Sequence, residues 1–241
     1  MVGKSFSDNV VYEIKKTDLK SPIIFAGFVG AGLVGPLSVG YMIEKLKMEE
    51  IGYLRSKHLP PSTVFMQGRL RHPFRLYANK EGTVCAIICE ITLPFGLHDI
   101  VNTILDWAEK NGSHEIVILD GVASKTHDSK AFCAAEEDLC RVMESNDINM
   151  IPQGFITGVA GGLLNECLMR PIQGLTLLVK ANDKGADPLA AATLIDAVNR
   201  AYGLNINTSD LRKKKKRIGA DFKELSDKYT EHRKIDSNMY M

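Results

Sequence analysis

Residues 21–47 read SPIIFAGFVGAGLVGPLSVGYMIEKLK and give the strongest indication of the architecture. The segment opens on an apolar run of strand length at 21–28, passes through closely spaced glycines, and ends in residues of helical composition at 37–47. This order predicts a strand, a tight turn and a helix.

The rest of the chain continues the alternation of strands and helices. Short apolar runs predict strands at 51–55, 63–66, 115–122 and 175–181, an extended segment at 155–157, and a hairpin formed by 74–79 and 83–91. Amphipathic or helix-favouring segments predict helices at 97–110, 131–145, 159–169 and 188–202. Near-continuous apolar strands that alternate with helices favour a three-layer α/β/α sandwich with a mostly parallel sheet.

The composition changes after about residue 205, where Lys, Asp and Glu replace the Gly, Pro and apolar runs. We therefore divide the chain into an α/β core domain (1–205), a helical extension (206–235) and a flexible docking tail (236–241). The basic run at 213–217 is interpreted as a solvated face of the extension. The spaced apolar residues of the extension fall on one side of a helix and predict a coiled-coil-like seam between copies of the chain: Leu211, Ile218, Phe222, Leu225 and Tyr229.

The composition is that of a globular cytoplasmic protein. Thirty basic and twenty-nine acidic residues leave a net charge of +1, which gives no whole-molecule argument for nucleic-acid or membrane-surface binding. The apolar stretches are too short and interrupted to predict a membrane span, and the first ten residues lack the apolar centre of a signal peptide. The odd number of cysteines and the absence of a CxxC pair predict reduced core thiols and no metal site: Cys85, Cys89, Cys133, Cys140 and Cys167.

Gly30, Gly32 and Gly35 form GAGLVG between a predicted strand and a predicted helix, which is the context of a dinucleotide-binding turn. That fingerprint also requires an acidic residue at the end of the second strand, where this chain has Arg55, Ser56 and Lys57. Arg55 would suit a 2′-phosphate, so a nucleotide- or nucleoside-binding enzyme stays an alternative. We favour a structural turn that lets the helix lie close to the sheet.

Two groups of polar residues follow predicted strands and are interpreted as loops. A hydrolytic triad would need a nucleophile on a GxSxG elbow, which the chain lacks. We therefore expect neither catalysis nor a cofactor from either group, the first made of Ser124, His127 and Asp128 and the second of Glu90, His98 and Asp99.

The chain ends in Met239, Tyr240 and Met241. This ending resembles the hydrophobic-Tyr-X terminus by which proteasome activators enter pockets between the α subunits of the 20S particle. A free carboxylate can pair with a pocket lysine, and the tyrosine ring adds contact area with a polar tip.

Together with IFAGFVGAGLVG (24–35), residues 41–46, the pair Asp120 and Gly121, and ITGVAGGL (156–163), this ending resembles the archaeal type of the proteasome assembly chaperone family. The resemblance implies a nucleoside-phosphorylase-like α/β/α core and an ATP-independent chaperone or activator. It also implies a homo-oligomer that binds the 20S proteasome α subunits. A scaffold for a non-proteasomal complex is the remaining alternative.

Overall fold

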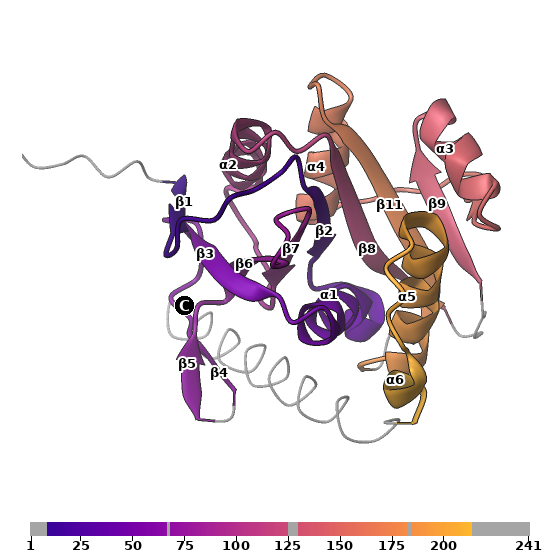
Figure 1. The fold of residues 1–241 in the computed structure, drawn as a ribbon, viewed down its shortest axis with the longest axis horizontal. Helices are drawn as coiled ribbons and strands as arrows, with labels where there is room; N and C mark the ends of the chain where they lie inside the picture. Colours follow the sequence, from indigo (N-terminus) through magenta and orange to yellow (C-terminus); the bar gives the residue numbers. More distant parts are fainter. Residues whose placement is uncertain (1–8, 67, 125–129, 183–184, 214–241) are drawn as a thin grey trace, which may run out of the picture.

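A computed structural model of the chain describes residues 9–66, 68–124, 130–182 and 185–213. Within these residues, nine strands form one sheet in the order β1-β3-β6-β7-β2-β8-β11-β9-β10 (Figure 1). The strands are β1 (Asn9–Glu13), β2 (Ile23–Gly27), β3 (Glu49–Ser56), β6 (Phe74–Ala78), β7 (Val84–Cys89), β8 (Glu115–Ala123), β9 (Ala131–Ala135), β10 (Asn149–Met150) and β11 (Gln173–Ala181).

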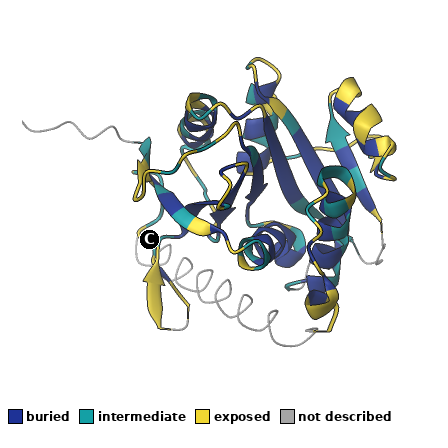
Figure 2. Cartoon of the chain, viewed as in Figure 1, coloured by how far each residue is buried: buried dark blue, intermediate teal, exposed yellow. Residues whose placement is uncertain are grey.

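Helices cover both faces of this sheet (Figure 1). One face carries α1 (Val34–Lys45), α3 (Glu137–Glu144), α5 (Pro188–Tyr202) and the short α6 (Ser209–Lys213), and the other carries α2 (Leu97–Lys110) and α4 (Gly158–Cys167). Alternate residues of the central strands enter the two cores, as Phe25 and Ile24 of β2 show. The central strands are buried over most of their length (Figure 2). The predicted α/β/α layering is thus confirmed for the described residues.

The prediction of a mostly parallel sheet is wrong. Among the described strands, β2–β7, β2–β8, β8–β11 and β9–β10 pair in parallel, whereas β1–β3, β3–β6, β6–β7 and β9–β11 pair antiparallel. Every residue of β6 and β7 is buried. Strands buried on both faces are continuously apolar whichever way they run, so the hydrophobic pattern cannot reveal their direction.

Two local predictions also need correction. The helix expected at 131–145 begins only at Glu137, because residues 131–135 form β9, which pairs with β11 through Cys133 and Leu177. Alanine-rich sequence favours a helix, but this tertiary pairing overrides the local preference. The segment expected to be extended at 155–157 joins no strand, although Thr157 has extended φ and ψ, and the strand before it is the unpredicted β10, which pairs with β9. The helices expected at 97–110 and 188–202 are confirmed with their bounds.

All five cysteines are free and buried, as predicted. Burial raises the pKa of Cys85 and of Cys89 to about 12, so both are thiols at neutral pH. None of the helices in the described ranges combines the length and apolarity needed to cross a bilayer.

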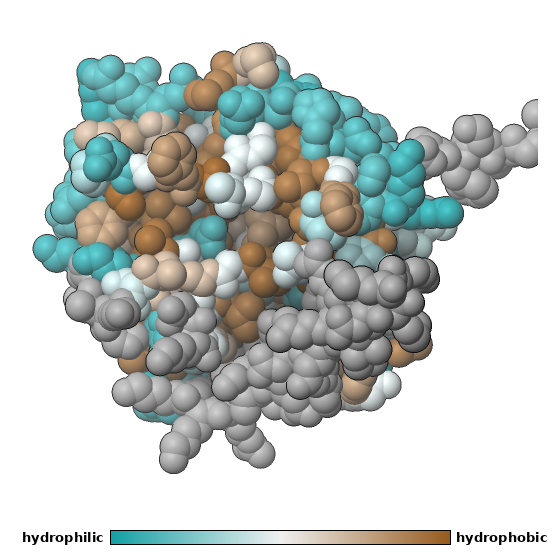
Figure 3. All heavy atoms as spheres, turned by 180° about the vertical axis from the view of Figure 1, so that it is seen from behind, coloured by the Kyte–Doolittle hydropathy of each residue, from teal (hydrophilic) through white to brown (hydrophobic). Residues whose placement is uncertain are grey.

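A separate two-stranded hairpin stands apart from the main sheet. It consists of β4 (Val64–Met66) and β5 (Arg69–Arg71), which pair antiparallel on either side of residues 67 and 68 (Figure 1). Seen from behind, hydrophobic residues gather near the middle of the face and hydrophilic ones lie along its upper rim (Figure 3). The most exposed large apolar side chains of the described residues include Phe65, Leu70, Phe95, Phe155, Leu168 and Met169.

An ion pair is buried beside the β6–β7 hairpin. Arg75 Nη2 lies 2.6 Å from Glu90 Oε2, and the two side chains are only 3% and 2% exposed. Arg75 Nε also donates to the Tyr77 hydroxyl at 2.8 Å, and that hydroxyl donates to Glu50 at 3.0 Å. Each charge therefore depends on its partner for compensation in the core.

Replacing Arg75 alone tests this dependence. Arg75→Met leaves the Glu90 carboxylate buried without its partner, so we expect a loss of about 3–5 kcal/mol in the free energy of unfolding. The double variant Arg75→Met, Glu90→Met should lose much less, because neither charge remains. Urea denaturation of Arg75→Met, Glu90→Met and the double variant measures the coupling energy between the two side chains. Losses that simply add would contradict the mutual dependence of the two charges.

Candidate functional site

The glycine turn joins β2 to α1 through a short 3-10 helix, η1 (Ala31–Leu33). Gly32 has a φ of 63°, in the left-handed region that favours glycine. A Cβ atom at Gly35 would lie 2.7 Å from the carbonyl oxygen of Leu119, and one at Gly30 would collide with the carboxylate of Asp120. The three glycines therefore let the start of α1 lie against the ends of β2 and β8.

The strand order separates Arg55 from this turn. In a dinucleotide-binding fold the second strand lies beside the first, so that its last residue reaches the ribose. Here β7 and β6 stand between β2 and β3, which places β3 about 14 Å away at the usual spacing between strands. Arg55 lies on β3 and is not positioned to contact a nucleotide bound at the turn.

The carboxylate of Asp120 faces the glycine turn at Gly30. Its Oδ1 accepts a hydrogen bond from the Gly121 amide at 2.7 Å and faces Gly30. Burial raises the pKa of Asp120 to about 6, so the side chain is mostly ionised at neutral pH. A carboxylate in this place repels an anion, and the turn is therefore poorly suited to hold a pyrophosphate.

Among the polar residues noted beside predicted strands, those that the structure describes have partners in different places. Glu90 pairs with Arg75 in the core, Asp99 lies 3.1 Å from His58, and His98 contacts Asn102. The Ser124 amide donates to the carbonyl of Ala181, whereas His127 and Asp128 lie outside the described residues. These contacts assemble no nucleophile, base and orienting group in one place.

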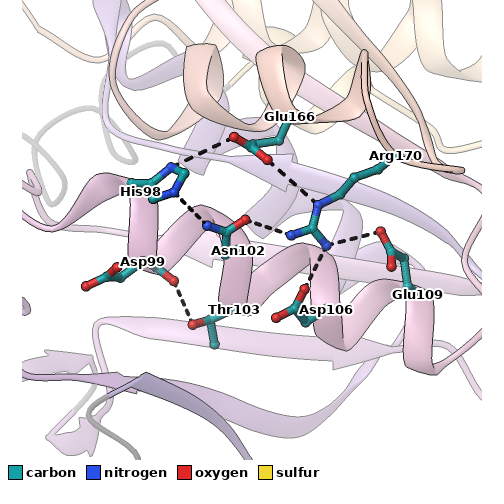
Figure 4. A network of polar contacts seen from close by, with 8 residues as sticks. All are labelled: His98, Asp99, Asn102, Thr103, Asp106, Glu109, Glu166 and Arg170. Atoms are coloured by element: carbon teal, nitrogen blue, oxygen red, sulfur yellow. Dashed lines mark hydrogen bonds and ion pairs between the residues drawn. The ribbon is translucent and has the colours of Figure 1, made fainter.

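A polar network links α2 to α4 (Figure 4). Arg170 Nη1 lies 2.7 Å from Asp106 and 3.1 Å from Glu109, and its Nη2 donates to Asn102 at 2.7 Å. Arg170 follows the end of α4 and also lies 3.8 Å from Glu166 of that helix, so its one guanidinium bridges carboxylates of both helices and acts as a clamp between them. Sequence reasoning missed it because Arg170 is more than 60 positions from its partners on α2.

The described chain ends at α6, which is fixed to the core. Leu211 is 1% exposed and belongs to the hydrophobic cluster beneath α1 and α5. Lys45 of α1 binds Asp210 at 2.9 Å, and the Tyr41 hydroxyl donates to the carbonyl of Asn207 at 2.7 Å. The packing of the core thus continues past residue 205 as far as Leu211.

The burial of Leu211 removes the first residue from the seam predicted between copies of the chain. Leu211 is covered by its own chain and so is not exposed to a second copy. The other predicted seam residues and the docking residues lie outside the described part of the chain: Ile218, Phe222, Leu225, Tyr229, Met239, Tyr240 and Met241. Their roles stay predictions.

Residues 24–226 match the PAC2 family. The chain belongs to the PAC2 family. A protein of unknown function from Thermoplasma acidophilum is 33% identical, with a TM-score of 0.86 and 91% of each chain covered. PbaA of Pyrococcus furiosus, an archaeal homolog of proteasome-assembly chaperone, is 26% identical with a TM-score of 0.80, covering 92% of this chain and 99% of PbaA.

A second Pyrococcus furiosus protein, the archaeal proteasome activator PbaB, has the same fold. It is 22% identical with a TM-score of 0.77, over 87% of this chain and 95% of PbaB. This PAC2 chain therefore shares its mixed α/β fold with structures of a chaperone homolog and an activator. The likeness to nucleoside phosphorylases stays a prediction.

Asp120→Asn tests the electrostatics of the turn. The folded protein binds the Asp120 proton more tightly than the unfolded chain does, because its pKa is raised from 3.8 to about 6. Wild-type stability therefore falls as the pH rises from about 4 to about 6, and this loss remains at higher pH. Asparagine keeps the acceptor for the Gly121 amide without the charge. We expect the variant to be more stable than wild type by about 1–3 kcal/mol at pH 8, and the difference to shrink toward pH 4.

Urea denaturation at several pH values measures this difference. Asp138→Asn is the matched control, because the Asp138 side chain is 92% exposed. An Asp120→Asn variant with the same stability as wild type at every pH would contradict the raised pKa of the Asp120 carboxyl.

Proposed function

We propose that this PAC2 protein is an ATP-independent proteasome assembly chaperone or activator that docks its C-terminal tail into pockets of the 20S proteasome α ring. Family membership supports a role of this kind, since PbaA is a homolog of proteasome-assembly chaperone at 26% identity. The observation that carries the proposal is the ending Met239, Tyr240 and Met241, which has the chemistry for such a pocket.

The contacts that fix α6 to the core support a division of the chain into a core that ends there and a tail that docks elsewhere. Twenty-eight residues follow Lys213, which would span at most about 90–100 Å if extended. The chain is thus long enough to present its last residues to a surface that the core itself does not touch. The free carboxylate would pair with a lysine, and the Tyr240 ring would fill an apolar pocket with its hydroxyl at the rim.

One tail of three residues offers little binding energy. Affinities between millimolar and micromolar correspond to about −4 to −8 kcal/mol, whereas linked tails gain effective concentration without new contacts. We therefore propose a homo-oligomer in which each protomer offers a tail to a separate α-subunit pocket. A demonstrated monomer that binds tightly would contradict this arrangement.

The nucleotide-binding alternative is not supported by the geometry of the turn. Asp120 faces Gly30, and Arg55 lies on β3, which two strands separate from β2. No group of His, Cys, Asp and Glu that could hold a metal ion occurs among the described residues. The proposal therefore assigns the protein no catalytic step.

Removing residues 239–241 tests tail docking. We expect the full chain to bind the purified α-subunit ring of its own organism and the truncated chain to lose that binding, as measured by surface plasmon resonance. Tyr240→Ala should weaken binding by at least about tenfold, because buried tyrosine anchors contribute strongly at interfaces. Tyr240→Phe separates the ring's contribution from that of the hydroxyl.

The result identifies the partner as well as the residue. Equal binding by full-length and truncated chains would mean that the tail is not the docking element. If neither chain binds, the tail serves a different complex, as the scaffold alternative holds, and pull-down from a lysate of the same organism would identify it.

A further inference from the structure

The strand β1 lies at one end of the main sheet, where it pairs with β3 on one side and with no described strand on the other (Figure 1). Natural sheets usually protect such an edge with Lys, Pro, a bulge or a covering segment. The sequence of β1 is NVVYE, which contains neither Lys nor Pro, and its register with β3 is continuous. This edge is therefore open to the addition of a further strand.

The hydrogen bonds between β1 and β3 determine which backbone groups the edge offers. The Ile14 amide donates to the carbonyl of Ile51 at 2.9 Å, and the register continues back through β1 without a break. In an antiparallel pair, every second residue turns its N–H and C=O toward the partner strand, and the residues between turn theirs away. The N–H and C=O groups of Val11 and Glu13 therefore point away from β3.

A stack of three aromatic rings ends at the same edge. The Tyr12 ring stacks on Tyr53 with centroids 5.1 Å apart, and Tyr53 stacks on His72 at 4.7 Å. Neighbouring strands are about 4.8 Å apart, so the rings repeat at the spacing of the strands. Tyr12 is 52% exposed, and no other ring in the described part of the chain stacks on it. Its outer face is thus placed to receive a ring from a strand added beyond β1.

Glu13 adds a negative charge to this edge. Its Oε1 accepts a hydrogen bond from Trp107 Nε1 of α2 at 3.2 Å, and the residue is exposed. It forms no ion pair with any other described residue. Because opposite charges on facing strands attract, a basic side chain opposite Glu13 would be favoured in an added strand.

We propose that β1 binds an extended segment of another protein as an additional antiparallel strand. Along its chain, the segment carries a basic residue opposite Glu13, then an aromatic residue opposite Tyr12, then a β-branched apolar residue opposite Val11. Val11 and Glu13 form the backbone hydrogen bonds. The pair at Tyr12 is then of the closely spaced kind, with Cα atoms about 4.5 Å apart, which brings the two rings into contact.

A second copy of β1 fits this edge less well. Helix α2 packs against β1, as the contact between Trp107 and Glu13 shows. Two edge strands related by a two-fold axis would bring their α2 helices together on one face of the joined sheet, whereas packed helices need about 8–10 Å between their axes. With Tyr12 opposite its own copy, Glu13 would face Val11 and gain no counter-charge. An extended segment avoids both problems.

A synthetic strand tests this contact without a proteasome, so the result is independent of the proposed function. The probe is the capped peptide Thr-Thr-Lys-Tyr-Val-Thr-Thr, added to the isotope-labelled full chain and followed by NMR. We expect the amide signals of Val11 and Glu13 to shift until saturation and their hydrogen exchange to slow, because these N–H groups gain acceptors. Unchanged signals from both amides at millimolar peptide would overturn the proposal.

Variants of β1 separate backbone pairing from side-chain contact. Val11→Pro removes one outward N–H and no bond to β3, which edge strands tolerate, and should weaken binding at least about fivefold. Val11→Thr keeps that N–H and is the matched control. Tyr12→Thr should weaken binding about fivefold through loss of the aromatic pair. Circular dichroism checks that each variant is folded, and equal affinities for Val11→Pro and Val11→Thr would contradict backbone pairing.

The charge at Glu13 is tested with a second probe that has Glu in place of Lys. Wild type should prefer the lysine probe by about fivefold. Glu13→Gln keeps an acceptor for Trp107 without the charge, so it should bind both probes equally. A preference that survives this substitution would contradict the pairing of Glu13 with a basic residue.

Two further outcomes identify other occupants of the edge. A dimer in sedimentation equilibrium that Val11→Pro converts to a monomer would assign the edge to a second copy. Peptide-induced shifts that appear only after deletion of residues 1–8 would assign it to the first residues of the same chain. Either result overturns the proposal.

Discussion

A Cβ atom at Gly27 would lie 2.5 Å from the carbonyl carbon of Gly35, so β2 and α1 can approach as they do only without side chains at these positions. The same restriction holds at Gly121 of β8, where a Cβ atom would collide with the carbonyl of Ala31. This close approach seats α1 over the centre of the sheet. With α1 in this position, its apolar side chains pack with those of α5 in one hydrophobic cluster. Leu211 belongs to the same cluster.

The glycine turn illustrates why a motif can be recognised and its function misjudged. Dinucleotide-binding turns and this turn need glycine for the same physical reason, the close passage of backbone against backbone. What separates them is the surrounding charge. Asp120 comes from a strand that is about 90 positions away in sequence, so the local motif contains no sign of the carboxylate that faces Gly30.

Much of the fold could be predicted from the sequence, but the arrangement of the strands could not. The helices at 97–110 and 188–202 have clear periodicity or capping residues, and they form with the expected bounds. Strand direction depends on pairing over long distances, which apolar runs do not encode. The α2–α4 clamp around Arg170 and the pairing of β9 with β11 depend on such contacts as well. For the candidate site, the helical stripe stays a prediction beyond Leu211, and the burial of Leu211 itself depends on the packed core, which the local spacing does not encode.

Leu211 has a different role from the one that the regular apolar spacing of the extension predicts for it. An apolar stripe with regular spacing reads as one interface, yet its first residue stabilises the chain's own core. The ion pair between Lys45 and Asp210 and that between Arg212 and Asp196 hold α6 from either side. The extension therefore begins from a point that is fixed relative to the sheet. In general, tethering a binding element to a fixed point raises its effective concentration near that point. Anchoring at the core would thus complement the tail docking proposed above, because it would increase the effective concentration of a weakly binding element.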